Sequence, residues 1–275
     1  MQNIRGVIAS LELFLHFVNT AVFPRTEEMA QKSSGLMRSS IRVYYRNMTA
    51  TTTFLQRFDC ITFDWDGTLF DSTAIITRCI QDAVVEVGGA RPSHEAACYV
   101  IGLGLMQALA HAAPDVPPEK YPALGEAYKR QWALHVDAID FFAGTMQMLL
   151  DLKTRGFKLA VATGKSRRGL DEVLQRELDG VKLKTLFDAT RTADQTAGKP
   201  DPLMLRELME ELDVKPDRML MIGDTTHDLL LARNAGVASV GVSFGAHDAQ
   251  AFAEFSPLHV AQSIAELHDW LIKNA

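Results

Sequence analysis

The strongest constraint on the fold is a regular alternation that begins near residue 58. Short runs rich in Val, Ile, Leu and Phe each end in a polar loop, and a stretch with helical spacing follows each run. Such alternation favours a parallel sheet covered by helices on both faces, because strands of that kind are apolar on both sides. The sequence therefore predicts an α/β fold with a Rossmann-like parallel sheet. Its strands are expected at residues 58–63, 157–162, 218–222 and 238–242.

A long insertion interrupts this alternation between Asp66 and Thr163. The segment is much longer than the roughly 30 residues of a strand–helix–strand unit. Apolar residues recur within it at three- and four-residue spacings, and Gly and Pro separate the runs. Helices are expected at 74–87, 95–112 and 118–137. We predict a small helical cap at residues 74–142, inserted into an α/β core formed by 54–73 and 143–275.

The first 53 residues differ from the rest of the chain. Their formal charge is +3, against −9 for the remainder. Glu12, His16 and Asn19 interrupt their apolar stretch and make it too polar for a membrane span. We expect residues 1–53 to be an N-terminal extension, either disordered or a transit-like leader. Because Met48 precedes the regular pattern, the alternative is that translation starts there and the extension is an artefact of the gene model.

Charge and cysteine content limit the partners and the compartment. The net charge of −6 leaves no basic excess to neutralise a phosphate backbone, so nucleic acid is not expected as a partner. No membrane partner is expected either, since no transmembrane helix is predicted. A small anion could still bind locally. The three cysteines form neither a CxxC pair nor the even set of a disulfide scaffold, which favours a reducing, cytoplasmic location. The sequence predicts no particular oligomeric state.

Four polar clusters close the predicted strands or follow them. Ligands of open α/β sheets bind outside the carboxyl ends of the strands, so these clusters form the candidate site. In the first cluster two carboxylates stand two residues apart beside Gly67, so that one can attack while the other moves a proton. The clusters are Asp64-Trp65-Asp66-Gly67-Thr68, Thr163-Gly164-Lys165, Gly198-Lys199-Pro200-Asp201 and Gly223-Asp224-Thr225-Thr226-His227-Asp228.

Taken in order, the four clusters resemble the motifs of haloacid dehalogenase-like phosphatases, from about residue 54 to the C-terminus. The resemblance implies that Asp64 is the nucleophile and forms an aspartyl-phosphate. It also implies that Asp66 protonates the leaving alcohol and then activates water. Dehalogenases of this family do not need the second acid, so the presence of Asp66 favours a phosphatase.

Four acids at one mouth require a cation. Asp224 and Asp228 join Asp64 and Asp66, and clustered negative charge facing a phosphate is unfavourable unless a cation intervenes. Mg²⁺ suits oxygen ligands and can bridge carboxylate and phosphate. The resemblance implies that Asp64, the backbone carbonyl of Asp66 and Asp224 bind it. Asp228 either supports the metal site or caps the helix expected at 229–235.

Phosphoryl transfer also needs donors for the phosphate oxygens. The Thr163 hydroxyl and the Gly164 N–H are expected to bind phosphate where the next helix begins. Lys199 resembles the phosphate-binding lysine of the family, and with Thr163 completes the predicted catalytic set.

Several neighbouring residues have less specific expectations. Trp65 is expected in the wall or core, and His227 beside the metal site or at the surface. The run Ile101-Gly102-Leu103-Gly104 resembles a substrate-specificity loop of phosphoglycolate phosphatases, or is simply a flexible turn. Three cations after the second cluster are expected on a solvated helix face, with a substrate carboxylate as the alternative partner: Lys165, Arg167 and Arg168.

The predicted function is Mg²⁺-dependent hydrolysis of a small phosphorylated metabolite. The nearest resemblance is to bacterial phosphoglycolate phosphatases, which makes 2-phosphoglycolate the expected substrate. A sugar phosphate or nucleotide is the alternative substrate, and a phosphomutase the alternative reaction. A phosphonate hydrolase ranks lower, because Lys120 and Lys129 lack a diagnostic context. The hypothesis from another class is a binding protein without turnover, and the intact acids argue against it.

Overall fold

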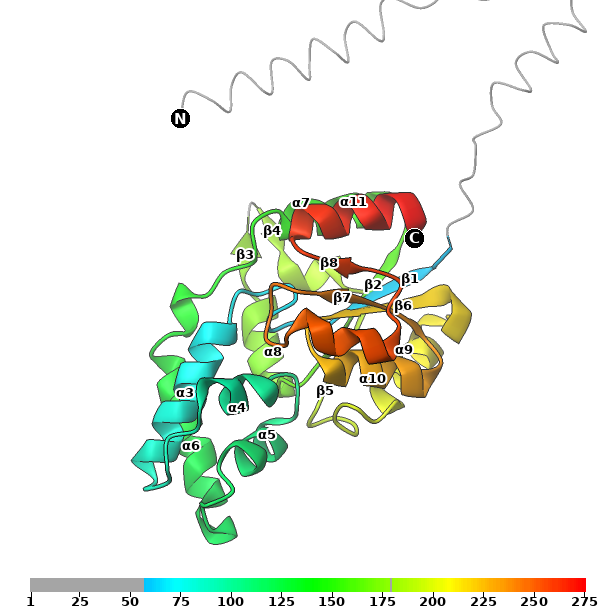
Figure 1. Ribbon diagram of the computed structural model, residues 1–275. Coiled ribbons are helices and arrows are strands. Elements are labelled where there is room, and N and C mark those ends of the chain that lie inside the picture. Colours follow the sequence, from blue (N-terminus) through cyan, green and yellow to red (C-terminus); the bar gives the residue numbers. More distant parts are fainter. Residues whose placement is uncertain (1–56, 179) are drawn as a thin grey trace, which may run out of the picture. The chain divides into compact units, whose positions relative to one another are not determined.

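A computed structural model describes residues 57–178 and 180–275. Their centre is a six-stranded parallel sheet with the order β5-β2-β1-β6-β7-β8 (Figure 1). The predicted α/β class is therefore confirmed. The strands are β1 (Cys60–Phe63), β2 (Lys158–Thr163), β5 (Ala189–Thr192), β6 (Met219–Gly223), β7 (Ala238–Val242) and β8 (Val260–Ala261).

Both faces of the sheet are buried, as the apolar runs predict. In β1, Ile61 and Phe63 belong to the core under α7 and α11, whereas Cys60 belongs to the core under α9 and α10. Figure 1 shows α7 and α11 on one side of the sheet and α9 and α10 on the other. These helices are α7 (Thr145–Thr154), α9 (Leu203–Leu212), α10 (Thr226–Ala235) and α11 (Ile264–Asn274).

Smaller elements complete the core. Helix α8 (Arg167–Leu174) follows β2, and a two-stranded antiparallel ribbon follows α8. Short 3-10 turns join several elements. The ribbon strands are β3 (Glu177–Leu178) and β4 (Val181–Lys182), and the 3-10 turns are Pro118–Lys120, Val136–Ala138, Leu183–Leu186, Pro216–Arg218 and Ala249–Phe255.

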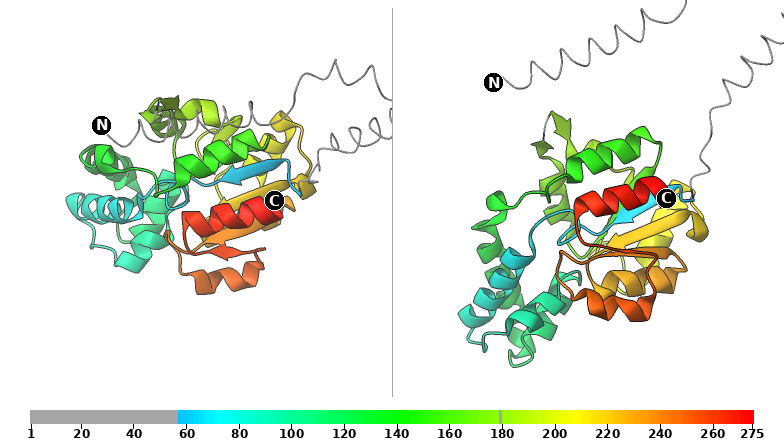
Figure 2. Two further views of the ribbon diagram at one scale, coloured as in Figure 1. Left: turned by 90° about the horizontal axis from the view of Figure 1, so that it is seen from above. Right: turned by 45° about the horizontal axis from the view of Figure 1, so that its top comes forward.

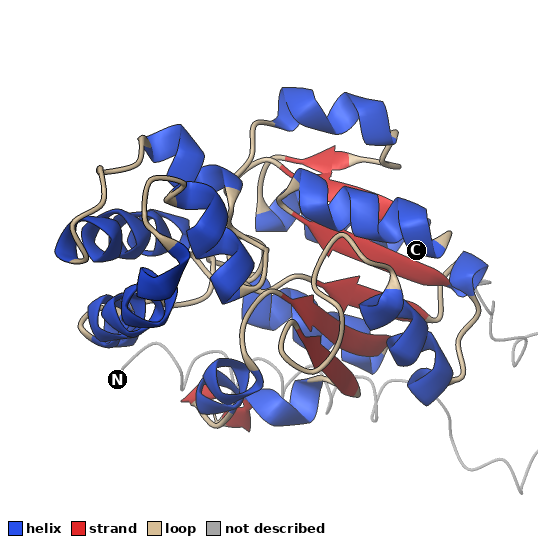
Figure 3. Ribbon diagram, turned by 90° about the horizontal axis from the view of Figure 1, so that it is seen from below, coloured by secondary structure: helices blue, strands red, loops and turns tan. Residues whose placement is uncertain are grey.

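The insertion after β1 is helical and has an apolar core of its own. Figures 2 and 3 show its four helices gathered at one end of the sheet. Ile80, Leu109 and Leu124, from three of these helices, are almost fully buried in this second core. The helices are α3 (Thr73–Glu86), α4 (His94–Tyr99), α5 (Leu105–Ala112) and α6 (Tyr121–Ala133).

The single helix expected at 95–112 is wrong, because the structure has two helices there. The chain leaves the helical path between Val100 and Gly104, where Gly102 adopts a φ of +92°. That left-handed conformation suits glycine, which has no Cβ to clash. The break turns the carbonyl groups of Gly102 and Leu103 toward Gly164 in the loop after β2.

The predictions for residues 1–53, including the start at Met48, lie outside the described residues. Within the described part of the chain, no helix combines the length and apolar character needed to cross a bilayer.

Candidate active site

Asp64 lies just beyond the end of β1, at the centre of the sheet. Its N–H donates to the carbonyl of Ile222 at 2.8 Å and so continues the pairing with β6. The strand order runs outward from β1 in both directions, through β2 on one side and β6 on the other. Ligands bind at such a switch point in α/β sheets, and the side chain of Asp64 is fully buried there.

Lys199 reaches the same point from the loop before α9. Its ammonium group lies 2.5 Å from Asp64 Oδ1 and 2.6 Å from Asp228 Oδ1, and its side chain is fully buried. Burial opposes the charge of this lysine, but Asp228 and Asp64 outweigh that effect and raise the pKa of Lys199. The ammonium group is therefore a permanent positive charge beside Asp64.

Asp224 stands at the end of β6, also fully buried. The Thr68 hydroxyl donates to its Oδ1 at 2.8 Å, and the Ala246 N–H donates to its Oδ2 at 2.8 Å. A Cβ at Gly67, where φ is +84°, or at Gly245 would lie 2.2 Å from Asp224 Oδ2. Both glycines are thus required by the close approach of the backbone to this carboxylate.

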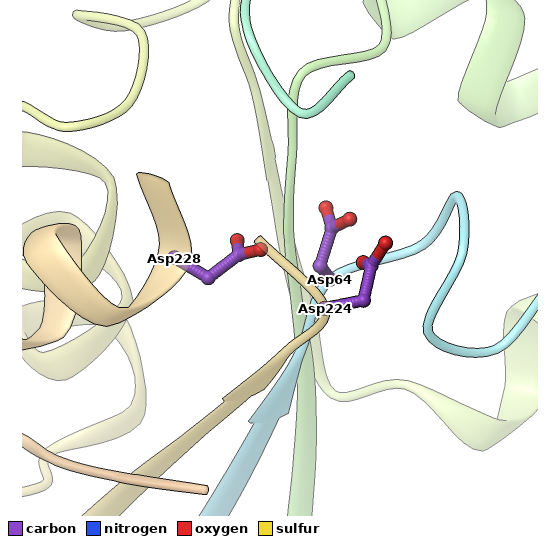
Figure 4. A group of neighbouring side chains, drawn as sticks. All are labelled: Asp64, Asp224 and Asp228. Carbon is purple, nitrogen blue, oxygen red and sulfur yellow. The ribbon is translucent and has the colours of Figure 1, made fainter. Parts of the chain in front are cut away.

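Asp64, Asp224 and Asp228 form a buried group of acids, each with a carboxylate oxygen within 4.8 Å of the others (Figure 4). Asp64 Oδ2 has no hydrogen-bond partner among the described residues. Burial, reinforced by the charge of Asp228, raises the pKa of Asp64 to about 7 despite the opposing charge of Lys199. Burial and the charge of Asp64 likewise raise the pKa of Asp224.

This acidic group fits a hard divalent cation. Its donors are all carboxylate oxygens, the donor type that Mg²⁺ prefers, and one of those oxygens lacks a partner among the described residues. A cation would also reverse the unfavourable burial of negative charge. Asp64 and Asp224 are two of the three predicted metal ligands, and the carbonyl of Asp66 is the third. All three assignments stay predictions.

The Asp66 side chain is held apart from the other acids. The Ser72 hydroxyl donates to its Oδ1 at 2.8 Å, and the Lys165 ammonium contacts its Oδ1 at 3.0 Å and its Oδ2 at 2.9 Å. Lys165 also lies 4.5 Å from the ring centroid of Trp132 on α6. Its side chain is only 10% exposed. The expectation of a solvated Lys165 is therefore wrong, because the insertion covers it and Asp66 pairs with it.

Asp228 occupies the third position of α10, and Thr225 is the N-cap. The Thr225 N–H donates to Asp228 Oδ2 at 3.1 Å, and the Thr225 hydroxyl lies within hydrogen-bond distance of the Asp228 N–H. These reciprocal bonds form a capping box. The alternative in which Asp228 is itself the N-cap is wrong, and its other oxygen faces Lys199.

Thr163 is the last residue of β2, and Gly164 follows it on the same edge of the sheet. Thr163 is buried, and its hydroxyl accepts from the Lys165 N–H at 3.2 Å. A cavity of about 790 Å³ is lined by both residues, together with Asp64 and Asp66. The predicted nucleophile, acid and phosphate-binding loop therefore face one space.

The remaining candidates lie around this centre. Arg167 pairs with Asp171 at 2.8 Å, and the side chain of Arg168 is 90% exposed. Trp65 is fully buried in the core against Phe70.

Two histidines join the insertion to the core. The ring Nε2 of His227 lies 2.8 Å from the carbonyl oxygen of Tyr99, and that of His247 lies 3.0 Å from the same oxygen. The end of α4 therefore contacts the loops around the acids.

Sequence reasoning missed Ser72, Gly245, Trp132 and the role of Lys165. Ser72 is the N-cap of α3, yet its hydroxyl binds Asp66 rather than the helix. Lys165 belongs to the cluster Thr163-Gly164-Lys165, so its position in the sequence could have indicated a place in the site. No spacing in the sequence links it to Trp132 or marks Gly245.

Comparison with known proteins supports the reading of these clusters. Residues 61–242 match the family described as haloacid dehalogenase-like hydrolase. A phosphoglycolate phosphatase from Vibrio vulnificus (strain CMCP6) is 30% identical over 229 residues, which span 80% of this chain and 99% of that protein. The pyrophosphatase PpaX from Halalkalibacterium halodurans is 26% identical over 211 residues, spanning 76% of this chain and 94% of that protein.

The fold is also similar to that of a solved structure from this family. A crystal structure of a haloacid dehalogenase-like hydrolase from Bacteroides fragilis superposes with a TM-score of 0.69 at 24% identity, covering 76% of this chain and 99% of that one. The predicted family and the predicted phosphatase class are confirmed by these matches. The chain belongs to the haloacid dehalogenase-like hydrolase family.

Proposed function

We propose that this chain is a Mg²⁺-dependent phosphomonoester hydrolase that acts through an aspartyl-phosphate at Asp64. The observation that carries the proposal is the environment of Asp64. One of its carboxylate oxygens contacts Lys199, the other has no hydrogen-bond partner among the described residues, and Asp64 is one of the residues that line the cavity. A carboxylate held on one side and open on the other suits nucleophilic attack.

The first half of the reaction transfers the phosphoryl group to the enzyme. A carboxylate oxygen of Asp64 attacks phosphorus, the bond to the ester oxygen breaks, and Asp66 gives its proton to the leaving alcohol. Lys199, the Thr163 hydroxyl and the Gly164 N–H donate to the phosphate oxygens. Donors fixed in a buried site stabilise the charge of the transition state without reorganising.

The second half regenerates the enzyme. Asp66, now ionised, accepts a proton from a water molecule as that water attacks phosphorus. The bond between phosphorus and Asp64 breaks, and inorganic phosphate leaves. Lys165 and Ser72 contact the Asp66 carboxyl group and keep it oriented in both halves.

In this proposal Mg²⁺ is held by Asp64, the carbonyl of Asp66 and Asp224, with Asp228 supporting the site through Lys199. The ion supplies charge neutralisation between the carboxylates and the phosphate. The raised pKa values of Asp64 and Asp224 support this assignment, since both carboxylates are buried beside like charges.

Residues 74–142 form the cap in this account, and 54–73 with 143–275 form the core. The separate apolar core of α3 to α6 supports that division. The cap closes the cavity opposite Asp64, excludes water and selects the leaving group.

A panel of phosphate compounds tests the proposal. The names of the relatives supply two members, 2-phosphoglycolate and pyrophosphate, and sugar phosphates and nucleotides complete it. We expect phosphate release with Mg²⁺ that EDTA abolishes and that Asp64→Asn lowers to background. Equal background rates for wild type and Asp64→Asn on the whole panel would favour a binding protein instead.

A further inference from the structure

The cavity above Asp64 is large for a two-carbon substrate. Its volume is about 790 Å³, and it extends from Asp64 and Thr163 at the sheet to α5 and α6 in the cap. Pockets that enclose drug-sized ligands have volumes of roughly 300–1,000 Å³. A phosphate group at Asp64 would therefore leave most of this space for the rest of the substrate.

The cap is already in contact with the core around this space. A Cβ at Gly164 would lie 2.5 Å from the carbonyl oxygens of both Gly102 and Leu103. The Tyr99 carbonyl oxygen lies within 3.0 Å of a ring nitrogen of both His227 and His247. The volume is therefore present with the cap seated on the loop after β2.

The walls contributed by the cap are mainly apolar. Ile80 and Val100 are buried in the second core and still border the cavity. On α6, the rings of Tyr128 and Trp132 stack on each other, with 14° between their planes, and both residues line the cavity. The apolar residues that line the cavity include Ile76, Ile80, Val100, Leu105, Met106 and Trp132.

The charged residues at the walls are engaged with each other. A compact polyanion such as 2-phosphoglycolate needs a cation for its carboxylate as well as donors for its phosphate, because a buried unpaired charge is costly. Among the described residues that line the cavity, each cation already has an acidic partner. The pairs are Lys129–Glu126 at 2.7 Å, Lys165–Asp66 at 2.9 Å and Arg168–Glu172 at 2.9 Å.

We infer that the substrate is a phosphomonoester of an alcohol with a sizeable apolar body, aromatic or branched, which fills the space between Trp132 and Met106. The inference rests on the proposed function and narrows its substrate class. Burial of the apolar body against these walls supplies the binding energy. The rings of Tyr128 and Trp132, which line the cavity, can contact an aromatic ring of the substrate.

A series of primary alkyl phosphates tests this inference, because their leaving groups differ little in intrinsic reactivity. We would measure kcat/KM of the full chain with Mg²⁺ for 2-phosphoglycolate, ethyl phosphate and 2-phenylethyl phosphate. We expect 2-phenylethyl phosphate to exceed both of the others by at least about tenfold, as apolar pockets discriminate by such factors. A preference for 2-phosphoglycolate or ethyl phosphate would overturn the inference and leave the proposed function intact. Hydrolysis of no ester above the Asp64→Asn rate would reject both.

A pair of cap variants tests where the apolar body lies. Met106 is 46% exposed at the cavity, and Val85 is 49% exposed on α3 away from it. We expect Met106→Glu to lower the ratio of kcat/KM for 2-phenylethyl phosphate to that for ethyl phosphate by about tenfold, because it places a charge against the apolar body. Val85→Glu, the matched control, should keep the wild-type ratio. An equal ratio in the two variants, both folded by circular dichroism, would overturn the placement.

Discussion

At the scale of single residues, Asp224 is a buried carboxylate whose negative charge is unfavourable in its surroundings. Its carboxylate is fully buried, accepts two hydrogen bonds and lies beside Asp64. Burial raises the pKa of Asp224, and the nearby acid adds to that effect. Such an arrangement is most stable when a cation is bound.

Magnesium should therefore stabilise the folded protein, since a ligand that binds only the native state raises its stability. We expect the unfolding temperature of the wild type to rise as Mg²⁺ is added. Asp224→Asn should remove most of that rise, because it takes away a predicted ligand. Thermal unfolding followed by fluorescence, with Mg²⁺ titrated into EDTA-treated protein, measures both. Equal shifts in the two proteins would contradict the assignment of Asp224.

Lys165 is the second residue whose environment makes a prediction. It contacts both oxygens of Asp66 and packs on Trp132, so in the proposed mechanism it orients the acid that donates and then accepts a proton. We expect Lys165→Met to lower kcat by roughly tenfold to a hundredfold, less than the roughly 10²–10⁴-fold that general acid–base catalysis contributes, because Asp66 itself is retained. Lys165→Arg should recover part of the loss.

Lys153 offers a matched control for that experiment. It contacts both oxygens of Asp188 at 2.9 and 2.8 Å, in a pair of similar geometry away from the cavity. Lys153→Met should leave kcat near that of the wild type. Equal losses of kcat in Lys165→Met and Lys153→Met would show that Lys165 acts through stability alone.

At the scale of elements, the contact between the loop at Gly102 and the loop after β2 decides how the cap sits. Gly164→Ala would place a Cβ 2.5 Å from two backbone carbonyl oxygens, which cannot rotate away. We expect the loop at residues 100–104 to move and kcat/KM to fall about tenfold, since small misplacements are costly in catalysis. Steady-state kinetics together with hydrogen exchange of that loop measure the effect.

The control for this substitution is Gly169→Ala on α8. Its Cβ would meet only the Ser166 hydroxyl, at 3.3 Å, and alanine is the better helix former. We expect unchanged exchange in the loop at residues 100–104. Unchanged exchange in Gly164→Ala as well would contradict the tight contact between the two loops.

Most of the central strands could be predicted from the sequence, but one edge strand and one helix break could not. The four predicted strands exist, with ends shifted by up to two residues, because each is an apolar run buried on both faces. The sheet edge at β5 was missed, since its sequence Ala-Thr-Arg-Thr is largely polar. The helix break at Gly102 was missed because apolar spacing continues on both sides of it.

Some residues of the candidate site could also be predicted from the sequence, and others could not. Residues that close strands, such as Asp64 and Asp224, could be found from the sequence because parallel strands end at one edge. The partners of Asp66 could not be found, because Lys165 and Trp132 approach it only when the cap packs on the core. The sequence did not identify Thr225 as the N-cap of α10, because Asp228 is also of a residue type favoured at that position.

At the scale of the whole molecule, the sheet brings together site residues that are far apart in the sequence. Lys199 and Asp64 are 135 residues apart and meet at 2.5 Å, while Thr68 and Asp224 are 156 apart and meet at 2.8 Å. In the proposed function the loops at the sheet edge supply the nucleophile and the acids, and the insertion supplies the far wall of the cavity. That proposal places the chemistry in the core and the choice of substrate in the insertion.

The most direct test of the account is to trap the phosphoryl group on Asp64. We would mix Asp66→Asn with para-nitrophenyl phosphate and Mg²⁺, since this leaving group needs no proton, whereas release of the enzyme-bound phosphate needs a base. The account predicts a burst of nitrophenol equal to the enzyme concentration, and mass spectrometry after acid quenching should find a base-labile phosphoryl group on Asp64. The absence of both the burst and the phosphorylated peptide, with the wild type active on the same ester, would contradict it.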